Sequence, residues 1–506
     1  MGQTPILPHA RWGRHHVKMK RMEHKEHRDP NFYRHLRAEF SDGWRWLDRA
    51  LVLAYGALAG GVVVVFTVLS HMAYEFFSGL YTEAPGWLIL FWTPLVTAGV
   101  VWLTLRFVPL AAGSGIPQVM AALDPELDDA GRSHFVSIKL TIGKVLLASA
   151  GLLGGLSAGR EGPSVQVAAG VMQHSRRWLR HRQGVANTHS LLVAGGAAGI
   201  AAAFNAPLAG VVFALEELSR QMESRYSGVI IASIVLAGLM GVSMFGNAAY
   251  FGTVQVPPLS MSSILPGIVV AVGGGLAGGL MAKLLAASLG GQSSDRFSAW
   301  RRQHPIRFAA ALGLVIAVIG MVSGGMTFGS GTEAARELLH AEHPIDHADT
   351  FGVLKFVTTW LTAWTGVPGG LFAPSLSVGA GIGYNVSTLL GYGVNTGIIA
   401  MGMTAFLAAV TQAPLTAFII VMEMIDGRPM VLSLMAVAMV AATISRMISR
   451  PLYETLSKRM LDNYRAKVAS AAPPQELPAP AAPSPEAATT PPEPSSPQTP
   501  PVPPSS

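Results

Sequence analysis

Long apolar stretches recur along this chain, and short segments rich in polar residues or in Gly and Pro separate them. Three of the clearest are ALVLAYGALAGGVVVVFTVLS from Ala50, WLILFWTPLVTAGVVWL from Trp87 and IRFAAALGLVIAVIGMVSGGM from Ile306. A helix needs about 20 apolar residues in a row to cross the hydrocarbon core of a bilayer. The pattern therefore predicts an all-α polytopic membrane protein.

The distribution of charge supports this prediction and suggests an orientation. Only 13% of the 506 residues are charged, against roughly 25% in soluble domains. The net charge is +7, but the basic residues gather at the ends of apolar stretches, as at 174–182 and 300–307. By the positive-inside rule such segments face the cytoplasm. We therefore expect both termini in the cytoplasm, an even number of crossings, and a lipid bilayer rather than nucleic acid as the partner.

The two ends of the chain differ from the apolar region between them. Residues 1–45 form a basic arm without the apolar core or cleavage site of a signal peptide, and we expect this arm in the cytoplasm. Residues 466–506 are rich in Pro, Ala and Ser. Such a composition cannot bury enough apolar surface to fold, so a disordered tail is predicted. The chain has no Cys, which excludes disulfides and thiol chemistry.

Comparison of the chain with itself reveals a repeat. Three pairs of segments match in the same order: GSGIP at 113–117 with GSGTE at 329–333, GREGPSVQVAAG at 159–170 with GLFAPSLSVGAG at 370–381, and FNAPLAGVVFALEE at 204–217 with TQAPLTAFIIVMEM at 411–424. The second pair is separated by 370 − 159 = 211 residues, and the same separation places Lys144 on Lys355. Because the separation is nearly constant, we predict two structural repeats, at 46–250 and 255–465. In membrane transporters built from inverted repeats, the substrate lies near the midplane, where discontinuous helices meet.

The repeated segments have the composition of helix starts. GSGIP, GREGP and GLFAP each join Gly, which lets the backbone approach a ligand, to Pro, which is favoured at the first helical position. Asn205 and Gln412, each two residues before a Pro, mark two further candidate starts. A helix that begins inside the bilayer presents unpaired N–H groups and the positive end of its dipole. Such an end binds anions without needing a full positive charge.

Glu161 stands at one of these predicted anion sites. A deprotonated carboxylate there takes the place of an anion, whereas the protonated side chain is neutral and free to leave. Anion movement would then be linked to protons, and intramembrane ionisable residues are functional by default. The alternative is structural: Arg160 and Glu161 form a pair that fixes a turn at the membrane surface.

GSGIP, GREGP and GLFAP, in this order and spacing, resemble the three signature motifs of the chloride channel and transporter (CLC) family. The resemblance covers about residues 46–460. It implies an inverted-repeat bundle of many tilted and partial helices, and a homodimer with a separate anion pathway in each subunit. It also implies a transporter rather than an enzyme, with chloride and protons as partners and with no cofactor and no metal site.

The resemblance also implies roles for individual residues. Two hydroxyl groups and several backbone amides would bind the anion, and one glutamate would act as the external gate and proton acceptor. Family members with proline in place of the motif serine are associated with nitrate, and a fluoride-preferring subgroup also departs from the serine, so the serine here favours chloride. The hydroxyls belong to Ser114 and Tyr453, the amides to Arg160, Gly162, Leu371, Phe372 and Ala373, and the gate is Glu161.

Two activities are open under this resemblance: chloride/proton antiport and a passive, voltage- or pH-gated chloride channel. Exchangers of the family carry an internal glutamate that hands protons towards the external one, and its interval after NAPLAG places it at Glu217. Its neighbour Glu216 has Glu423 as repeat partner. The alternative is that the Glu-Glu pair merely marks the cytoplasmic end of a helix. Antiport is the favoured prediction, and the lack of a large regulatory domain after the membrane region suggests a prokaryotic plasma membrane.

Two other classes of protein are weighed against this prediction. GLSAG at 155–159 matches the pattern of serine hydrolases, with Ser157 as nucleophile, but that motif needs a preceding strand with His and acid partners. In a Gly- and Ala-rich membrane helix, small residues more often serve close packing. A cation transporter would need several buried acidic groups or exposed carbonyls, whereas the Gly-Pro segments mark helix N-termini, which favour anions.

Overall fold

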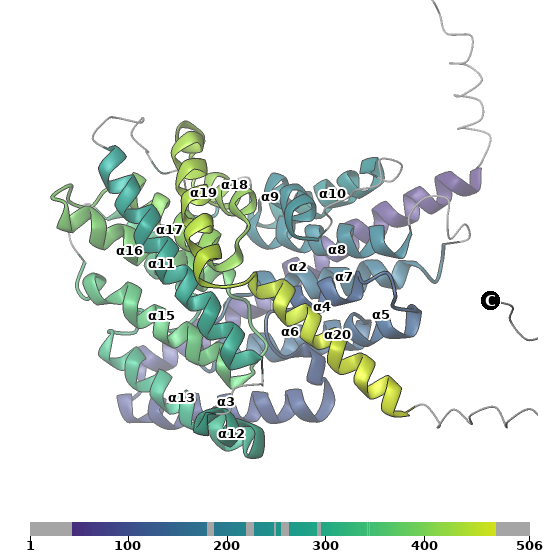
Figure 1. The fold of residues 1–506 in the computed structure, drawn as a ribbon, viewed down its shortest axis with the longest axis horizontal. Helices are drawn as coiled ribbons and strands as arrows, with labels where there is room; N and C mark the ends of the chain where they lie inside the picture. The colour runs from purple at the N-terminus through teal and green to yellow at the C-terminus, as the bar shows by residue number, and fades with distance from the viewer. Residues whose placement is uncertain are drawn as a thin grey trace, which may run out of the picture.

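The computed structural model describes residues 43–179, 187–218, 227–246, 249–252, 254, 263–290, 295–341, 343 and 345–471. All regular structure in these residues is helical, and the extended pairings among them are two isolated bridges, Gly113 with Pro368 and Gly159 with Gly370. Figure 1 shows the helices of the first part of the chain, in purple and blue, beside those of the second part, in green. The predicted all-α architecture is confirmed.

The first half of the chain forms two long helices followed by shorter ones. The long helices are α2 (Gly43–Glu83) and α3 (Gly86–Phe107), and Pro94 lies inside the second of them. The other elements are η1 (Pro109–Ala111), α4 (Ile116–Ala122), α5 (Asp129–Phe135), α6 (Ile138–Leu153), α7 (Glu161–Ser175), α8 (Thr188–Phe204), α9 (Pro207–Phe213), the π-helical turn η2 (Ala214–Leu218) and α10 (Ser227–Phe245).

The second half follows a similar order. Its elements are α11 (Ile264–Leu289), α12 (Arg296–Gln303), α13 (Pro305–Val322), α14 (Thr332–His340), α15 (Ala348–Thr365), α16 (Phe372–Leu389), α17 (Thr396–Thr411), α18 (Pro414–Met424), η4 (Arg428–Met430), α19 (Val431–Ile448) and α20 (Leu452–Ala471). The helices that begin at the repeated segments, α4, α7 and α9, correspond in order to α14, α16 and α18. The repeat boundaries at 46–250 and 255–465 stay a prediction, and this order is compatible with them.

Several helices have the length and composition of membrane spans. Within the described ranges seven helices are long and apolar enough to cross a membrane: Trp46–Glu83, Gly86–Phe107, Asp129–Leu153, Gly228–Phe245, Ile264–Leu289, Pro305–Val322 and Arg428–Ile448. Three shorter apolar helices accompany them, at Thr188–Phe204, Thr396–Thr411 and Pro414–Ile425. Large apolar side chains such as Phe91 and Leu95 are exposed on the outer surface, as expected for helices that contact lipid tails.

Small residues let the inner helices pack closely. A side chain at Gly199 of α8 would collide with the backbone of Ser164 in α7, and one at Gly402 of α17 would collide with the backbone of Gly379 in α16. Nearly all residues of these four helices are buried. Glycines of α8 and α17 therefore allow close helix packing, which holds α7 and α16 inside the molecule.

α20 runs from the second half of the molecule across to α4 (Figure 1). Near its end, Arg465 forms ion pairs with Asp124 at 3.3 Å and with Glu126 at 2.6 Å. The helix continues to Ala471, so the segment 466–506 predicted as disordered begins as helix, and its remainder lies outside the described residues. The predicted arm at 1–45 lies outside them too, apart from its last residues.

Candidate functional site

Three of the repeated turns meet in the interior. Gly159 and Gly370 exchange two backbone hydrogen bonds, with N···O distances of 2.9 and 2.6 Å. The amide of Gly369 donates to the carbonyl of Gly113 at 3.1 Å. These contacts join the turn before α4 to the turns before α7 and α16. Segments far apart in the sequence thus bring three helix N-termini together.

Ser114 lies in the turn before α4. Gly115, the N-cap of this helix, has a φ of 104°, which a residue with a Cβ adopts only under strain. A Cβ added at Gly162 would collide with Ser114 Oγ, so this hydroxyl lies directly beside the first turn of α7. The Oγ atom is buried and has no hydrogen-bond partner among the described residues. A buried hydroxyl without a partner costs free energy, so this position suits a ligand that accepts a hydrogen bond.

Glu161 is the first residue of α7 and is only 1% exposed. Its carboxylate lies near the backbone amides of Arg160 and of Ala373, so it occupies the N-terminal ends of both α7 and α16. A Cβ at Gly159 would collide with its Oε2 atom, which has no hydrogen-bond partner in the described part of the chain. The Arg160 guanidinium instead donates to the hydroxyl of Tyr250 at 3.1 Å. The burial of Glu161 argues against a turn at the membrane surface.

Tyr453 reaches the same place from the first turn of α20. Its side chain is buried, and its ring stacks on Phe372 with the centroids 6.4 Å apart and the planes 5° from parallel. Its hydroxyl lies near the Ser114 side chain and makes no hydrogen bond with the described residues. Leu371 is the N-cap of α16. The structure thus gathers around one point the residues predicted to bind the anion: Ser114, Arg160, Gly162, Leu371, Phe372, Ala373 and Tyr453.

The two neighbouring glutamates predicted after α9 lie in η2, and Glu216 makes a contact that the sequence does not reveal. Glu216 accepts hydrogen bonds from the amides of residues 415–416, at the start of α18, at 3.0 and 2.6 Å. Its repeat partner Glu423, in α18, accepts from the amides of residues 208–209, at the start of α9, at 3.2 and 2.7 Å. Each of these glutamates therefore caps the short helix of the other half.

Glu217 has different surroundings from Glu216. It is half-buried and lies close enough to Tyr453 to act on it electrostatically. Tyr453 in turn lies beside Ser114. Glu161 lies at the helix ends beside Ser114, and Glu217 lies near Tyr453, so both border the same group of hydroxyls. Glu216 thus caps α18, whereas Glu217 lies near Tyr453.

Two fully buried lysines brace equivalent turns in the two halves. Each ammonium group donates to two backbone carbonyls in the turn that precedes a helix. Lys144 donates to Ala111 and Gly113, both at 2.7 Å, and Lys355 donates to Thr327 at 2.9 Å and to Gly329 at 2.7 Å. The carbonyls accept two of the three hydrogens of each ammonium group, and such partners make the burial of a lysine tolerable. Lys144 thereby fixes the turn that carries Ser114.

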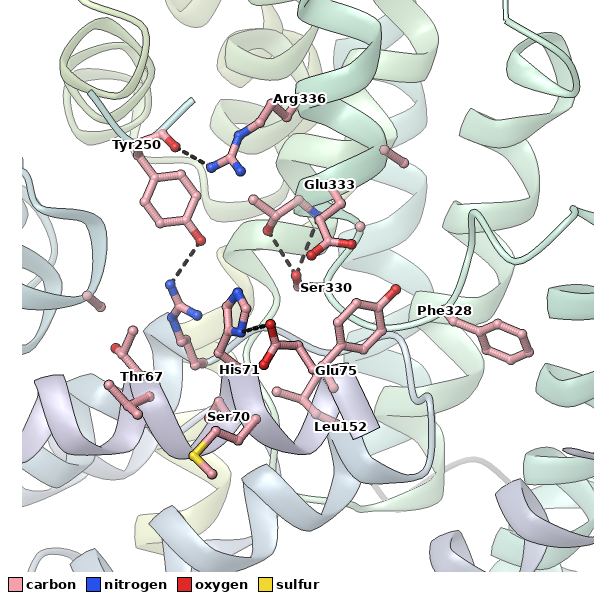
Figure 2. Close-up of a pocket in the computed structure, with 18 of the residues that line it drawn as sticks. Thr67, Ser70, His71, Glu75, Leu152, Tyr250, Phe328, Ser330, Glu333 and Arg336 are labelled. Carbon is pink, nitrogen blue, oxygen red and sulfur yellow. Dashed lines mark hydrogen bonds and ion pairs between the residues drawn. The ribbon is translucent and has the colours of Figure 1, made fainter. Parts of the chain in front are cut away.

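A cavity of about 730 Å³, here called the Arg160 cavity, adjoins the N-terminal end of α7. Figure 2 shows His71 and Glu75 of α2 on one side of it, and Ser330, Glu333 and Arg336 on the other, with Tyr250 beside Arg336. His71 Nδ1 lies 3.2 Å from a Glu75 carboxylate oxygen. The sequence did not predict this cavity, because its lining comes from segments that are far apart in the chain.

The residues of the competing interpretations have other surroundings. Ser157 is buried, its Oγ lies 2.8 Å from Thr359 Oγ1, and its amide donates to Thr362 Oγ1 at 3.2 Å. It therefore packs the two halves together and does not offer an accessible nucleophile. In the part of the chain that the structure describes, no group of three His, Asp or Glu side chains is placed to hold a metal ion.

Comparison with known proteins adds an independent finding. The sequence model of the family described as "Voltage gated chloride channel" matches residues 95–446. The H(+)/Cl(-) exchange transporter ClcA of Vibrio vulnificus (strain YJ016) is 28% identical over 443 residues, which cover 82% of this chain and 90% of that protein.

Two solved structures share the fold. A slow cyanobacterial Cl⁻/H⁺ antiporter superposes with a TM-score of 0.70 at 23% identity, covering 83% of this chain and 99% of that one. A CLC-type fluoride/proton antiporter superposes with a TM-score of 0.65 at 22% identity, covering 81% and 97%. At these identities the likeness concerns the fold alone, and it confirms the predicted bundle of tilted and partial helices.

Proposed function

We propose that this chain, which belongs to the voltage gated chloride channel (CLC) family, carries chloride across a membrane in exchange for protons. The protein is a multi-pass membrane protein and a transporter, not an enzyme. The relative from Vibrio vulnificus is named for the same exchange. We place the protein in a plasma membrane as a homodimer, with both termini in the cytoplasm and without a cofactor.

One observation carries this proposal. The buried hydroxyls of Ser114 and Tyr453 have no hydrogen-bond partners among the described residues, yet both lie close to the helix N-termini that meet at this point. Hydroxyl and amide hydrogens are donors, and helix N-termini are positive. An unhydrated chloride ion would satisfy these donors, which supports the assignment of the anion site to this place.

The coupling to protons follows from the position of Glu161. Its carboxylate lies at the same helix ends that would bind the anion, so a deprotonated Glu161 and a chloride ion compete for these amides. Protonation removes the charge of the side chain and its attraction to the helix ends, and chloride then takes its place. By linkage, each anion that passes is thereby tied to a proton on Glu161.

We assign the transfer of protons on the opposite side to Glu217. It is half-buried and lies near Tyr453, whereas its neighbour Glu216 is held by two backbone amides. The capping contact gives Glu216 a structural role, and the interval after NAPLAG, by resemblance to the family, supports Glu217 as the proton carrier. The second candidate is a passive chloride channel, which would use the same anion site but would need no proton carrier.

The test is a flux assay with purified protein in liposomes. Vesicles are loaded with chloride, the voltage is clamped with potassium and valinomycin, and external chloride and pH are followed together. We expect chloride to leave and protons to be driven in against their gradient. In Glu161→Gln and Glu217→Gln, chloride should still pass while proton movement is lost.

Glu216→Gln is the matched control, because it makes the same chemical change one residue away and should keep proton coupling. Chloride flow without proton movement in the unmodified chain would establish the channel and overturn the role of Glu217. Replacement of chloride by nitrate or fluoride in the same vesicles tests the choice of anion, and faster transport of either would overturn the chloride assignment.

A further inference from the structure

We propose that Tyr250 is a positioning residue, which holds the Arg160 guanidinium at the entrance to the anion site and so sets the affinity for chloride arriving from the Arg160 cavity. This inference rests on the proposed function. Nothing in the sequence pairs Tyr250 with the turn at Arg160, because the two are far apart in the chain and Tyr250 belongs to the segment between α10 and α11.

Tyr250 contacts the guanidinium in two ways. Its hydroxyl accepts a hydrogen bond from a terminal nitrogen of Arg160 at 3.1 Å, and the guanidinium carbon lies 5.8 Å from the centre of its ring. Figure 2 shows the tyrosine ring projecting into the cavity with its hydroxyl hydrogen-bonded there. A hydrogen bond and a cation–π contact to the same ring together restrict where this long side chain lies.

The backbone around Tyr250 is itself fixed from several sides. Arg336 of α14 donates to the Tyr250 carbonyl at 2.7 Å, and the amide of Phe251 donates to the carbonyl of Met424 at the end of α18 at 2.9 Å. His340 Nε2 lies 2.7 Å from the Phe251 carbonyl. The tyrosine is therefore anchored to the second half of the molecule and reaches across to the α7 turn of the first half.

The chemistry of the partner matters as much as its position. A carboxylate would neutralise the guanidinium, whereas a phenol is uncharged and orients it without cancelling its charge. The Nε atom of Arg160 is buried and has no partner within the described residues, so one of its N–H donors is available. Arg160 also directly precedes Glu161, at the mouth of the helix ends that would bind chloride. A fixed positive charge at such a mouth raises the local concentration of anions.

Several acidic groups in the cavity make this positioning necessary. Glu75, Glu333 and Glu337 line the same space as Arg160, and His71 is within ion-pair distance of Glu75. A guanidinium released from Tyr250 would be attracted towards these carboxylates, or towards Glu161 beside it. In either place its charge would be neutralised and no longer available to an incoming anion. Tyr250 thus keeps the charge at the entrance.

The experiment measures chloride affinity separately on the two faces of the membrane. Variants are made in a Met72→Cys background, since the chain has no other Cys and Met72 lines the cavity. An impermeant maleimide added outside then blocks the molecules whose Arg160 cavity faces outward, which gives the rate for each orientation. Chloride is varied on one side at a time, and the half-saturating concentration and the maximal rate are recorded.

We expect Tyr250→Phe to raise the half-saturating chloride concentration on the cavity side by about three- to tenfold, the effect of losing one hydrogen bond to a charged group that is partly exposed. The value on the opposite face and the maximal rate should be unchanged. Tyr250→Leu, which also removes the ring, should raise it further. Tyr74→Phe is the matched control, because it removes another hydroxyl that lines the same cavity and should leave all these values unchanged.

An unchanged cavity-side affinity in both Tyr250 variants would overturn the inference, and so would an equal loss on both faces, which indicates a general structural effect. In an Arg160→Gln background, Tyr250→Phe should have no additional effect on affinity, and an additive effect would also contradict the proposal. The proposed function fails separately: chloride flux without coupled proton movement would show a channel, and its chloride affinity on the cavity side would still report on Tyr250.

Discussion

In the first half of the chain, the helix that follows the GREGP turn begins with Glu161, whereas in the second half the corresponding helix, α16, begins with Phe372. The two turns are joined by backbone hydrogen bonds between Gly159 and Gly370. The first turn of α7 therefore presents the buried carboxylate of Glu161, and the first turn of α16 presents the buried ring of Phe372, which stacks on Tyr453. The scaffold is shared, and the titratable group is present in one copy only.

The serines of the two GSG turns differ in the same way. Ser330 Oγ lies 2.9 Å from Thr332 Oγ1 and has its hydrogen bond within the turn. Ser114 Oγ is buried and unpaired among the described residues. The Ser114 hydroxyl is thus available to a ligand, whereas the Ser330 hydroxyl is already hydrogen-bonded within its own half. Similar turns thus place helix N-termini in both halves, whereas the side chains available to a ligand at these turns differ between the halves.

The largest change in stability is expected from the glycines that allow close helix packing in each half. Gly199→Ala in the first half and Gly402→Ala in the second each place a methyl group against backbone atoms that cannot move aside without shifting a helix. We expect both to lower the free energy of unfolding by about 3 kcal/mol, at the upper end of overpacking costs. Thermal unfolding in detergent measures this, and Gly228→Ala, where a Cβ meets open space, is the control. A large difference between Gly199→Ala and Gly402→Ala would show that the two halves are not packed alike.

The buried lysines should give the next largest effect. Lys144→Met and Lys355→Met each leave two carbonyl oxygens without their donor, at a cost of about 2 kcal/mol. Stability should fall similarly in both variants, but chloride affinity, measured by isothermal titration, should fall more in Lys144→Met, whose turn carries Ser114. Equal losses of affinity would mean that the Ser114 turn has no special part in binding.

The reciprocal caps should have smaller and equal effects. Glu216→Gln and Glu423→Gln keep the shape of the side chain but remove the charge that faces a helix N-terminus, which is worth about 1 kcal/mol. We expect both variants to unfold a few degrees earlier, and the double variant to lose roughly the sum of the two. Proton coupling in liposomes should persist in all three. Loss of coupling in Glu216→Gln alone would transfer the proton role from Glu217 to its neighbour.

The smallest effect should separate the two serines. Ser114→Ala removes a hydroxyl that is unpaired in the described structure, so stability should hardly change, whereas chloride affinity should fall by about 1 kcal/mol, roughly fivefold. Ser330→Ala should leave chloride affinity unchanged, because its hydroxyl is engaged within its own turn. Titration of both variants with chloride measures these affinities. A similar loss of affinity in Ser330→Ala would contradict the division of roles between the halves.

Much of the architecture could be predicted from the sequence, because length and apolarity decide which helices cross a bilayer. The helix starts at GSGIP, GREGP and GLFAP were predicted as well, although Pro117, Pro163 and Pro374 lie at the second or third helical position rather than the first. Asn205 and Gln412 were expected to begin helices. Instead each ends one, with φ of 54° and 59°, and the next helix starts at the Pro that follows.

What the sequence could not reveal depends on contacts between distant segments. The capping of α18 by Glu216 and the contact of Tyr250 with Arg160 join residues that no local pattern links. The place of Tyr453 beside Ser114 came from resemblance and not from spacing. Local physical chemistry determines where helices begin and which groups they present, but only the folded arrangement shows which of these groups meet.

α20 has a mechanical consequence. A helix of 20 residues behaves as a rod about 30 Å long, and its first turn carries Tyr453, which lies against Phe372 and Ser114. Its other end is held by the ring of Tyr464, which lies 5.0 Å from that of His134 and 5.6 Å from that of Phe135, and by the ion pairs of Arg465 with Asp124 and Glu126. A force applied to the chain beyond Ala471 would thus reach the buried tyrosine through a stiff helix that contacts both halves of the molecule.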